Sequence, residues 1–239
     1  MYNNIELFLD SPYSYGGSNV PRVTHILSEM LHEDALIGWA YKMGTMGRDI
    51  DDIKDDAADK GSIVHAMCEY FLRYRMFMQI PDGTPYRARR ECQNAFNSFL
   101  LWIDNINNNH MWKPLALEEP LICELFGGTM DALLQIDDGI YLIDFKTSNF
   151  LNYKYCLQVA AYRYMLRVTR GIEVDGCCVL RLEKRKKNCF PEEMFFDLHD
   201  KEMKSFMDNC EAMFINIANG YWQRAQTEAQ YKCITGKRF

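Results

Sequence analysis

The sequence lacks any long hydrophobic run. No stretch of the 239 residues approaches 18 uncharged apolar side chains, the length that indicates a transmembrane helix. The N-terminal segment MYNNIELFLDSPYSYGG also lacks the basic and then apolar layout of a secretion signal. We therefore expect no membrane association and a cytoplasmic location.

Closely spaced cysteine pairs are missing as well. The nine cysteines are an odd number, and none belongs to a Cys-x-x-Cys pair. Neither a disulfide framework nor a zinc ribbon is therefore indicated. Scattered buried thiols in a reducing compartment are the expected arrangement.

Positive charge is in deficit. The 27 Lys and Arg residues stand against 33 Asp and Glu, which gives a net charge of −6. This balance argues against a protein that is held on nucleic acid by bulk charge, but it allows an enzyme with a local basic groove. Basic runs occur at residues 87–90 and 181–187, and each run by itself is typical of a solvated face or loop.

The remaining composition is that of an ordinary globular protein, with 48% hydrophobic and 25% charged residues. The chain shows no internal repeat, low-complexity segment or linker, so we expect one domain over residues 1–239. Residues 1–110 have mainly helical spacing, and residues 111–239 contain the strands. The patterns predict helices at 25–44, 63–78, 86–106, 151–168 and 200–225, capped in two cases by Thr24 and Ser62, and strands at 114–126, 128–136, 140–148, 174–182 and 194–198.

The clearest chemical pattern lies in the hairpin of the second and third predicted strands. Side chains alternate along a strand, so Asp144 and Lys146 share one face. A two-residue turn at Asp138-Gly139 predicts that Asp131 lies opposite Lys146 and diagonally next to Asp144, at roughly 7 to 8 Å. A turn longer by one residue would move Asp131 to the other face.

Two carboxylates this close together are costly unless a cation lies between them. A hard divalent ion such as Mg²⁺ suits them, because it takes oxygen ligands and often binds only one or two protein carboxylates. Lys146 would then orient or deprotonate the attacking water and stabilise charge that develops on a phosphate. The alternative for Asp144-x-Lys146 is a surface salt bridge, which is common for the bare tripeptide.

The flanking helices carry further candidates at a spacing of four. His65 and Glu69 project from one face of their helix, as do Gln158 and Tyr162 from theirs. Read alone, His65 and Tyr162 are more typical of partly buried core positions. These residues can belong to one site only if both helices pack across the same hairpin.

Arginines follow Gln158 on its helix. Arg163, Arg167 and Arg170 are expected either to contact phosphates or to be exposed to solvent. The two readings are evenly balanced from the sequence.

These motifs, taken in order, resemble the RecB-type branch of the PD-(D/E)xK nuclease superfamily. The resemblance spans residues 61–162 and rests on four motifs: Gly61-x-x-x-His65-x-x-x-Glu69, Gly127-Gly128-Thr129-Met130-Asp131, Ile143-Asp144-Phe145-Lys146-Thr147-Ser148 and Gln158-x-x-x-Tyr162. The opening Val20-Pro21-Arg22-Val23-Thr24 is similar to that of exonucleases close to the mitochondrial genome-maintenance exonuclease and its phage relatives. If a phage encodes the chain, the expected location is the host cytoplasm.

The resemblance implies an α/β fold with a restriction-endonuclease-like core, a central mixed β-sheet flanked by helices, and a helical N-terminal elaboration. It implies Mg²⁺- or Mn²⁺-dependent hydrolysis of DNA. Asp131 and Asp144 would be metal ligands with the carbonyl of Phe145, and His65 would bind or orient the metal. Lys146 would serve the nucleophilic water. Gln158 and Tyr162 would contact the DNA backbone or support Lys146.

Two details of the family remain to be assigned. The acidic strand residue that precedes the glycines is either Glu118 or Glu119. Some relatives hold an iron-sulfur cluster with a tight C-terminal group of cysteines. Here Cys189, Cys210 and Cys233 are about twenty residues apart, so no cluster is expected.

The function expected from the sequence is therefore that of a metal-dependent DNA nuclease. An exonuclease on single-stranded or end-containing DNA, in recombination, repair or DNA processing, is the preferred interpretation. The alternatives are an endonuclease of the same fold and a non-catalytic module that binds nucleic acid or inhibits a protein.

Overall fold

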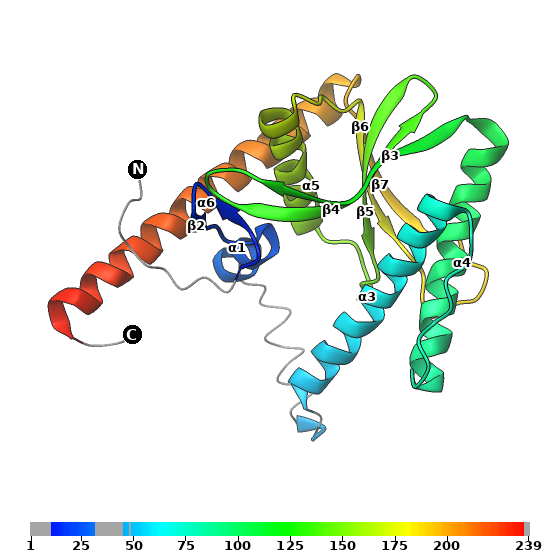
Figure 1. Cartoon of the computed structure of the whole chain (residues 1–239), viewed down its shortest axis with the longest axis horizontal. Helices are drawn as coiled ribbons and strands as arrows, with labels where there is room; N and C mark the ends of the chain where they lie inside the picture. Colours follow the sequence, from blue (N-terminus) through cyan, green and yellow to red (C-terminus); the bar gives the residue numbers. More distant parts are fainter. Residues whose placement is uncertain (1–10, 32–44, 48, 237–239) are drawn as a thin grey trace.

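A mixed five-stranded sheet forms the centre of the molecule (Figure 1). The structure is a computed structural model that describes residues 11–31, 45–47 and 49–236. The strand order is β3-β4-β5-β6-β7, and only β5 and β6 are parallel to each other. The expected α/β architecture with a central mixed sheet is confirmed. The strands are β3 (Trp112–Ile122), β4 (Gly127–Ile136), β5 (Gly139–Lys146), β6 (Gly176–Arg181) and β7 (Glu192–Asp197).

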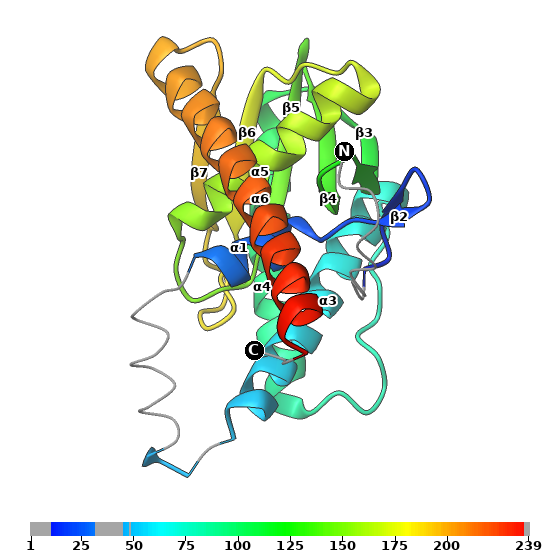
Figure 2. The same cartoon turned by 90° about the vertical axis from the view of Figure 1, so that its left-hand side faces the viewer.

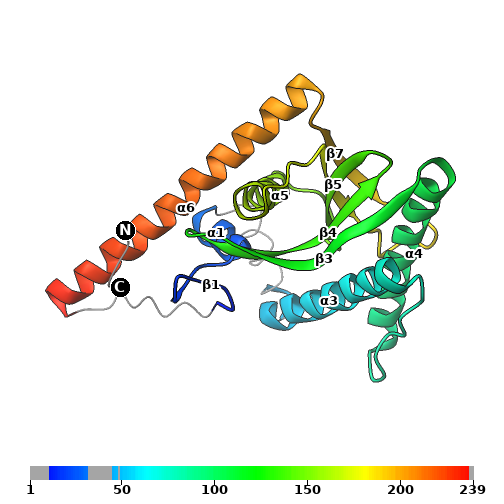
Figure 3. The ribbon, with the colours of Figure 1, turned by 45° about the horizontal axis from the view of Figure 1, so that its top comes forward.

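Helices cover both faces of this sheet. On one side lie α3 (Ile50–Tyr74) and α4 (Tyr86–Asn109), as Figure 3 shows. On the other side α6 (Lys201–Thr235) runs diagonally across α5 (Tyr153–Met165), with α1 (Val23–Met30) beside them (Figure 2). A π-helical turn, η1 (Leu166–Arg170), follows α5. None of the helices in the described part of the chain is long and apolar enough to span a membrane.

Strand β5 is buried on both faces because it lies between these two helical layers. Leu142 packs in the hydrophobic cluster formed with α1, α5 and α6. Its neighbours Ile143 and Phe145 pack with Phe99 of α4 and Met67 of α3 in the other cluster. The alternation of side chains along one strand thus ties both layers to the sheet. Asp144, which lies between Ile143 and Phe145 in the sequence, is 1% exposed.

Helix α3 starts much earlier than the sequence patterns predict. Its N-cap is Asp49, whose carboxylate accepts hydrogen bonds from the backbone N–H of Asp51 at 2.8 Å and of Asp52 at 3.4 Å. The acidic run therefore forms the first turns of the helix, where negative charge is favourable. Ser62 is not a cap, because it lies inside the helix and donates to the carbonyl of Ala58 at 3.1 Å.

Two other helix boundaries differ from the prediction. Helix α1 is described as far as Met30, and the part of the predicted helix from residue 32 to 44 lies outside the described residues. Helix α6 continues to Thr235 instead of ending near residue 225. It ends at Gly236, which has φ 66° and donates to the carbonyl of Lys232 at 2.9 Å.

The N-terminal arm contacts the sheet next to the glycine motif. A short hairpin of β1 (Ser14–Tyr15) and β2 (Ser18–Asn19) precedes Pro21, whose carbonyl accepts from the N–H of Gly127 at 3.0 Å. The hydroxyls of Tyr13 and Thr129 lie 2.8 Å apart. This arm therefore secures the start of β4, the strand that carries Asp131.

Candidate functional site

The β4–β5 hairpin turns at Asp137-Asp138, one residue earlier than predicted. Ile136 pairs with Gly139, so the predicted pairing of Asp131 with Lys146 is wrong. The end of α4 selects this turn: Asp137 has φ 50°, and its carboxylate accepts from the N–H of Met111 at 3.0 Å. The ring of His110 lies 2.6 Å from the same carboxylate.

In the observed register each residue of β4 faces a β5 residue that lies two positions before the predicted one. The strand faces are therefore preserved, and the two carboxylates still share a face. Because Ala132 pairs with Ile143, the same register places Asp131 directly across from Asp144. The backbone ladder stops at that pair, and the N–H of Phe145 instead donates to Asp131 Oδ2 at 2.6 Å.

Strand β3 brings a third carboxylate to the same level. Leu117 pairs with Ala132 and Glu119 with Met130, so Glu118 lies across from Asp131. Glu118 has φ 48°, an unusual backbone conformation for a residue other than glycine. Three acidic residues thus lie side by side on β3, β4 and β5.

The choice between the two glutamates depends on these contacts. Glu118 offers a carboxylate oxygen within 4.8 Å of ligand atoms of His65 and Asp131. Glu119 instead forms an ion pair with Arg170 at 2.6 Å. Glu118 is therefore the glutamate that lies in the carboxylate cluster.

His65 and Asp131 are in direct contact. His65 Nδ1 lies 3.1 Å from Asp131 Oδ1. Burial alone would raise the pKa of Asp131, but the positive charge of His65 and Lys146 outweighs it and lowers that pKa. Burial would likewise lower the pKa of His65, and the charge and hydrogen bond of Asp131 raise it instead. The pair therefore favours a charged imidazole next to a carboxylate when no cation is present.

Asp144 and Lys146 form the second pair, with Asp144 Oδ2 2.5 Å from Lys146 Nζ. Asp144 is 1% exposed, and its Oδ1 has no hydrogen-bond partner among the described residues. Burial raises the pKa of Asp144 to about 6, even though Lys146 opposes the shift. The carboxylates of Asp144 and Asp131 outweigh burial at Lys146 and raise its pKa. A buried, unsatisfied carboxylate oxygen thus lies beside a charged ammonium group.

A cavity of about 510 Å³ opens next to this cluster. His65 and Glu69 both line it, so their spacing of four does place them on one face of α3. Glu69 also pairs with Arg73 at 2.6 Å. A larger cavity of about 690 Å³ lies at the turn end of the hairpin, near Gly139, and holds none of the clustered carboxylates. Of the clustered residues, His65 and Glu118 line the smaller cavity.

Gln158 and Tyr162 lie on α5 against the same hairpin. The side-chain amide of Gln158 donates to the Tyr162 hydroxyl at 3.1 Å, and both residues are buried. Burial raises the pKa of Tyr162 and the negative charge of Asp144 raises it further. The two helices that carry His65 and Tyr162 therefore do pack across one hairpin, from its two sides.

Gly128 leaves the space that the ring of Tyr162 fills. A Cβ atom at Gly128 would lie 2.6 Å from Tyr162 Cε1. We expect Gly128→Ala to destabilise the protein by about 1–3 kcal/mol, because the buried ring has to move. Urea unfolding followed by circular dichroism measures this. Gly220→Ala is the matched control, since its Cβ would meet only Met30 Cε at 3.5 Å in the middle of α6. Equal stability of the two variants would contradict the packing.

Arg163 and Arg167 point away from the carboxylate cluster and toward α6. Arg163 is 4% exposed and pairs with Asp208 at 2.7 Å, and Arg167 pairs with Glu211. Arg163 and Arg167 are therefore not simply solvated, because carboxylates of α6 match their charges. Contact of Arg163 and Arg167 with DNA phosphates stays a prediction, and the side chain of Arg167 is 34% exposed.

The raised pKa values predict a pH dependence of stability in the absence of divalent ions. Burial and then Asp131 raise the pKa of Glu118 to about 7, and that of Asp144 is about 6. A group whose pKa is higher in the folded state stabilises fully below its unfolded pKa and loses this contribution as the pH passes its folded pKa. His65 acts in the same direction. The midpoint of thermal unfolding in chelator should therefore fall between about pH 5 and pH 8, by roughly 5 °C.

The variant Glu118→Gln tests this pH dependence. In this variant the midpoint of thermal unfolding should fall less steeply with pH, because the amide does not ionise. Glu119→Gln should leave the dependence of the midpoint on pH unchanged. Calorimetry from pH 5 to pH 8 in chelator measures both slopes. If Glu118→Gln keeps the wild-type slope, Glu118 does not carry the effect.

Comparison with known proteins gives one family match. The family model described as the PD-(D/E)XK nuclease superfamily matches residues 38–235, a range that includes every clustered carboxylate. No curated protein matches the chain. Among solved structures, the crystal structure of SSO0001 is similar at 12% identity, over 66% of this chain and 74% of that chain, with a TM-score of 0.27.

Proposed function

Because the chain belongs to the PD-(D/E)XK nuclease superfamily, we propose that it is a Mg²⁺- or Mn²⁺-dependent deoxyribonuclease of the RecB-type branch. Its preferred substrate in this proposal is single-stranded or end-containing DNA, cut as an exonuclease in recombination, repair or DNA processing in the cytoplasm. Residues 1–239 would act as one domain. The observation that carries the proposal is the row of Glu118, Asp131 and Asp144 beside Lys146.

The residues present fit a hard divalent ion. Asp144 Oδ1 is buried without a hydrogen-bond partner among the described residues, and a cation would satisfy it. His65, Glu118 and Asp131 offer ligand atoms within 4.8 Å of one another. Asp131, Asp144 and the carbonyl of Phe145 would hold the ion, with His65 and Glu118 next to it. When bound, such an ion would polarise the phosphate and help to activate water.

Lys146 is proposed to orient the attacking water rather than to deprotonate it. Two carboxylates raise its pKa, so its ammonium group is charged near neutral pH. A charged ammonium donates hydrogen bonds and has no lone pair to accept a proton. It would therefore position the water and stabilise the negative charge that develops on the phosphate. Tyr162, held by Gln158, would support this arrangement from α5.

Two alternatives remain open to experiment. An endonuclease of the same fold would use the same residues. A non-catalytic binding or inhibiting module is less well supported, since Asp131, Asp144 and Lys146 are all present and lie together. A degenerate site would be expected to have lost at least one of them.

Digestion of three DNA substrates tests the proposal. End-labelled linear single strands, linear duplex and closed circular DNA are incubated with Mg²⁺, Mn²⁺ or EDTA. Metal-dependent loss of the linear substrates alone is the expected result and supports an exonuclease. Nicked circles would show an endonuclease. Intact DNA with either metal, together with retained DNA binding, would support the binding module and contradict catalysis.

A further inference from the structure

A basic cluster lies at the end of the strand that carries Lys146. The chain leaving β6 continues beside β5, and the N–H of Leu182 donates to the carbonyl of Lys146 at 2.7 Å. Lys184 is two residues further on, or about 7 Å at roughly 3.3 Å per residue. From the other side, Lys60 precedes Gly61, where a Cβ atom would lie 3.4 Å from Thr147 Oγ1. Both lysines therefore belong to segments that flank the end of β5, next to Lys146.

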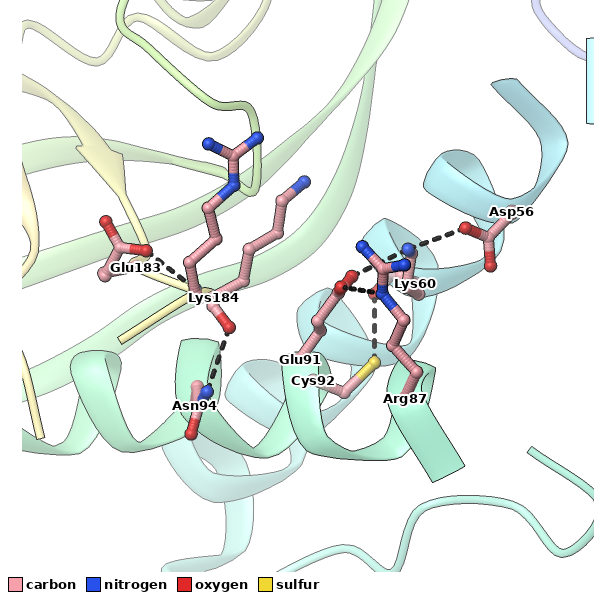
Figure 4. Close-up of polar contacts among 9 residues, drawn as sticks. Asp56, Lys60, Arg87, Glu91, Cys92, Asn94, Glu183 and Lys184 are labelled. Atoms are coloured by element: carbon pink, nitrogen blue, oxygen red, sulfur yellow. Dashed lines mark hydrogen bonds and ion pairs between the residues drawn. The ribbon is translucent and has the colours of Figure 1, made fainter. Parts of the chain in front are cut away.

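The backbone at Lys184 is held in place by buried polar groups of α4. Asn94 is 6% exposed, and its side-chain amide donates to the carbonyl of Lys184 at 3.0 Å (Figure 4). Ser98 is fully buried, and its hydroxyl accepts from the N–H of Glu183 at 3.2 Å. Buried polar side chains on a helix are costly unless they are used in this way. The position of Lys184 is thus part of the fold rather than that of a loose loop.

The carboxylates of Asp56 and Glu91, whose charges act on Lys184, form ion pairs with other cations. Lys60 lies between Asp56 and Glu91, at 2.7 Å from each, and Glu91 also accepts from Arg87 at 3.1 Å. The ammonium group of Lys184 makes no hydrogen bond or ion pair within the described part of the chain. Accordingly, no dashed line reaches this group in Figure 4.

The surroundings of Lys184 disfavour its charged form. Burial lowers the pKa of Lys184 most, and the like charges of Lys60 and Arg185 lower it further, although the carboxylates of Glu91 and Asp56 oppose the shift. A partly buried cation beside another cation is unfavourable unless an anion binds there. The exposed Arg185 follows directly and adds a third positive charge. The ammonium group of Lys184 is therefore left without a hydrogen-bonding acceptor among the described residues.

We propose that Lys184, supported by Lys60 and Arg185, forms a phosphate-binding subsite for the DNA strand next to the bond that is cut. This inference rests on the proposed function and adds a contact to it. Phosphate oxygens are strong acceptors that lysine binds as a point charge. The phosphate is either an internal one of the strand or a terminal one, and the two are distinguished by the substrates below.

Binding of single-stranded oligonucleotides in EDTA, with and without a terminal phosphate, tests the subsite. Lys184→Gln should weaken binding about tenfold at low salt, as expected for the loss of one charged hydrogen bond. The slope of log K against log salt should fall by about 0.7. Lys184→Arg keeps the charge and should restore most of the affinity. Lys187→Gln is the matched control, because this exposed lysine lies in the same loop and the charge change is identical.

The outcomes separate the subsite from catalysis. An equal loss on both oligonucleotides supports an internal phosphate, and a loss only with the terminal phosphate supports an end-binding subsite. Equal affinities and salt slopes for Lys184→Gln and Lys187→Gln would overturn the subsite, whereas metal-dependent cleavage by the wild type would leave the nuclease standing. The reverse pattern, weaker binding by Lys184→Gln without any cleavage by the wild type, would support the subsite and contradict the proposed activity.

Discussion

DNA cleavage is expected to fall by about 10³-fold or more when Asp144 is replaced by asparagine. The amide has nearly the same shape as the carboxylate but carries no charge to hold a divalent ion or to pair with Lys146. Asp144 lies at the β5 end of the row of carboxylates and is buried, on the strand between β4 and β6. Binding of Mn²⁺, measured by calorimetry without DNA, should weaken in parallel with cleavage.

The control for this change is Asp138→Asn on the same hairpin. Asp138 is exposed at the turn, so its amide variant removes the same charge without touching the cluster. It should cleave at the wild-type rate. Asp144→Asn that retains both Mn²⁺ binding and cleavage would rule Asp144 out as a ligand, provided that thermal unfolding shows both variants folded.

Replacing Lys146 by methionine is expected to reduce the turnover rate by about 10²- to 10⁴-fold while leaving DNA affinity within about twofold. Methionine keeps an unbranched apolar side chain of similar length. The substitution also removes the contact of the ammonium group with the Tyr155 ring, whose centre lies 5.2 Å from Lys146 Nζ. Only the ammonium group, which would act on water and on the developing charge, is lost. Single-turnover cleavage at saturating metal measures the chemical step.

The metal-binding readout separates Lys146 from Asp144. Lys146→Met should bind Mn²⁺ at least as well as the wild type, because a positive charge next to the carboxylates has been removed. Lys113→Met, at an exposed position of β3, is the control for general effects of the substitution. If Lys146→Met lost metal binding as completely as Asp144→Asn, the lysine would have a structural role in the cluster instead.

Several features of the site follow from local spacing alone. The two-residue period of β5 places Asp144 and Lys146 on one face, and the four-residue period of a helix aligns His65 with Glu69. Such patterns are local because the backbone geometry of a strand or a helix sets them within a few residues. They were sufficient to predict the hairpin, the flanking helices and the family resemblance.

The register of the hairpin is a different case. The sequence Asp137-Asp138-Gly139 allows more than one two-residue turn, and Asp138-Gly139 is the one that local preference favours. Contacts of Asp137 with His110 and Met111, more than 25 residues away, select the other. Asp131 and Asp144 still share a face of the sheet because the predicted and observed registers differ by two residues, an even number.

Other assignments also required the tertiary structure. Glu118 and Glu119 are adjacent and chemically identical, and only the pairing of β3 with β4 brings the first of them to Asp131. Arg163 looks like a surface residue in the sequence, but it is buried against Asp208 of α6. Lys184 belongs to a basic run that is typical of a loop, and α4 holds it at the end of β5.

The sequence by itself determined the elements that carry the chemistry, the strand face shared by Asp144 and Lys146, and the family to which the motifs point. The tertiary structure decided which residues from different elements meet: Glu118 with Asp131, Arg163 with α6, and Lys184 with the end of β5. The physical reason is the range of the interactions involved. Backbone periodicity acts over a few neighbouring residues, whereas strand register and ion pairs between helices depend on the packing of segments that are far apart in the chain.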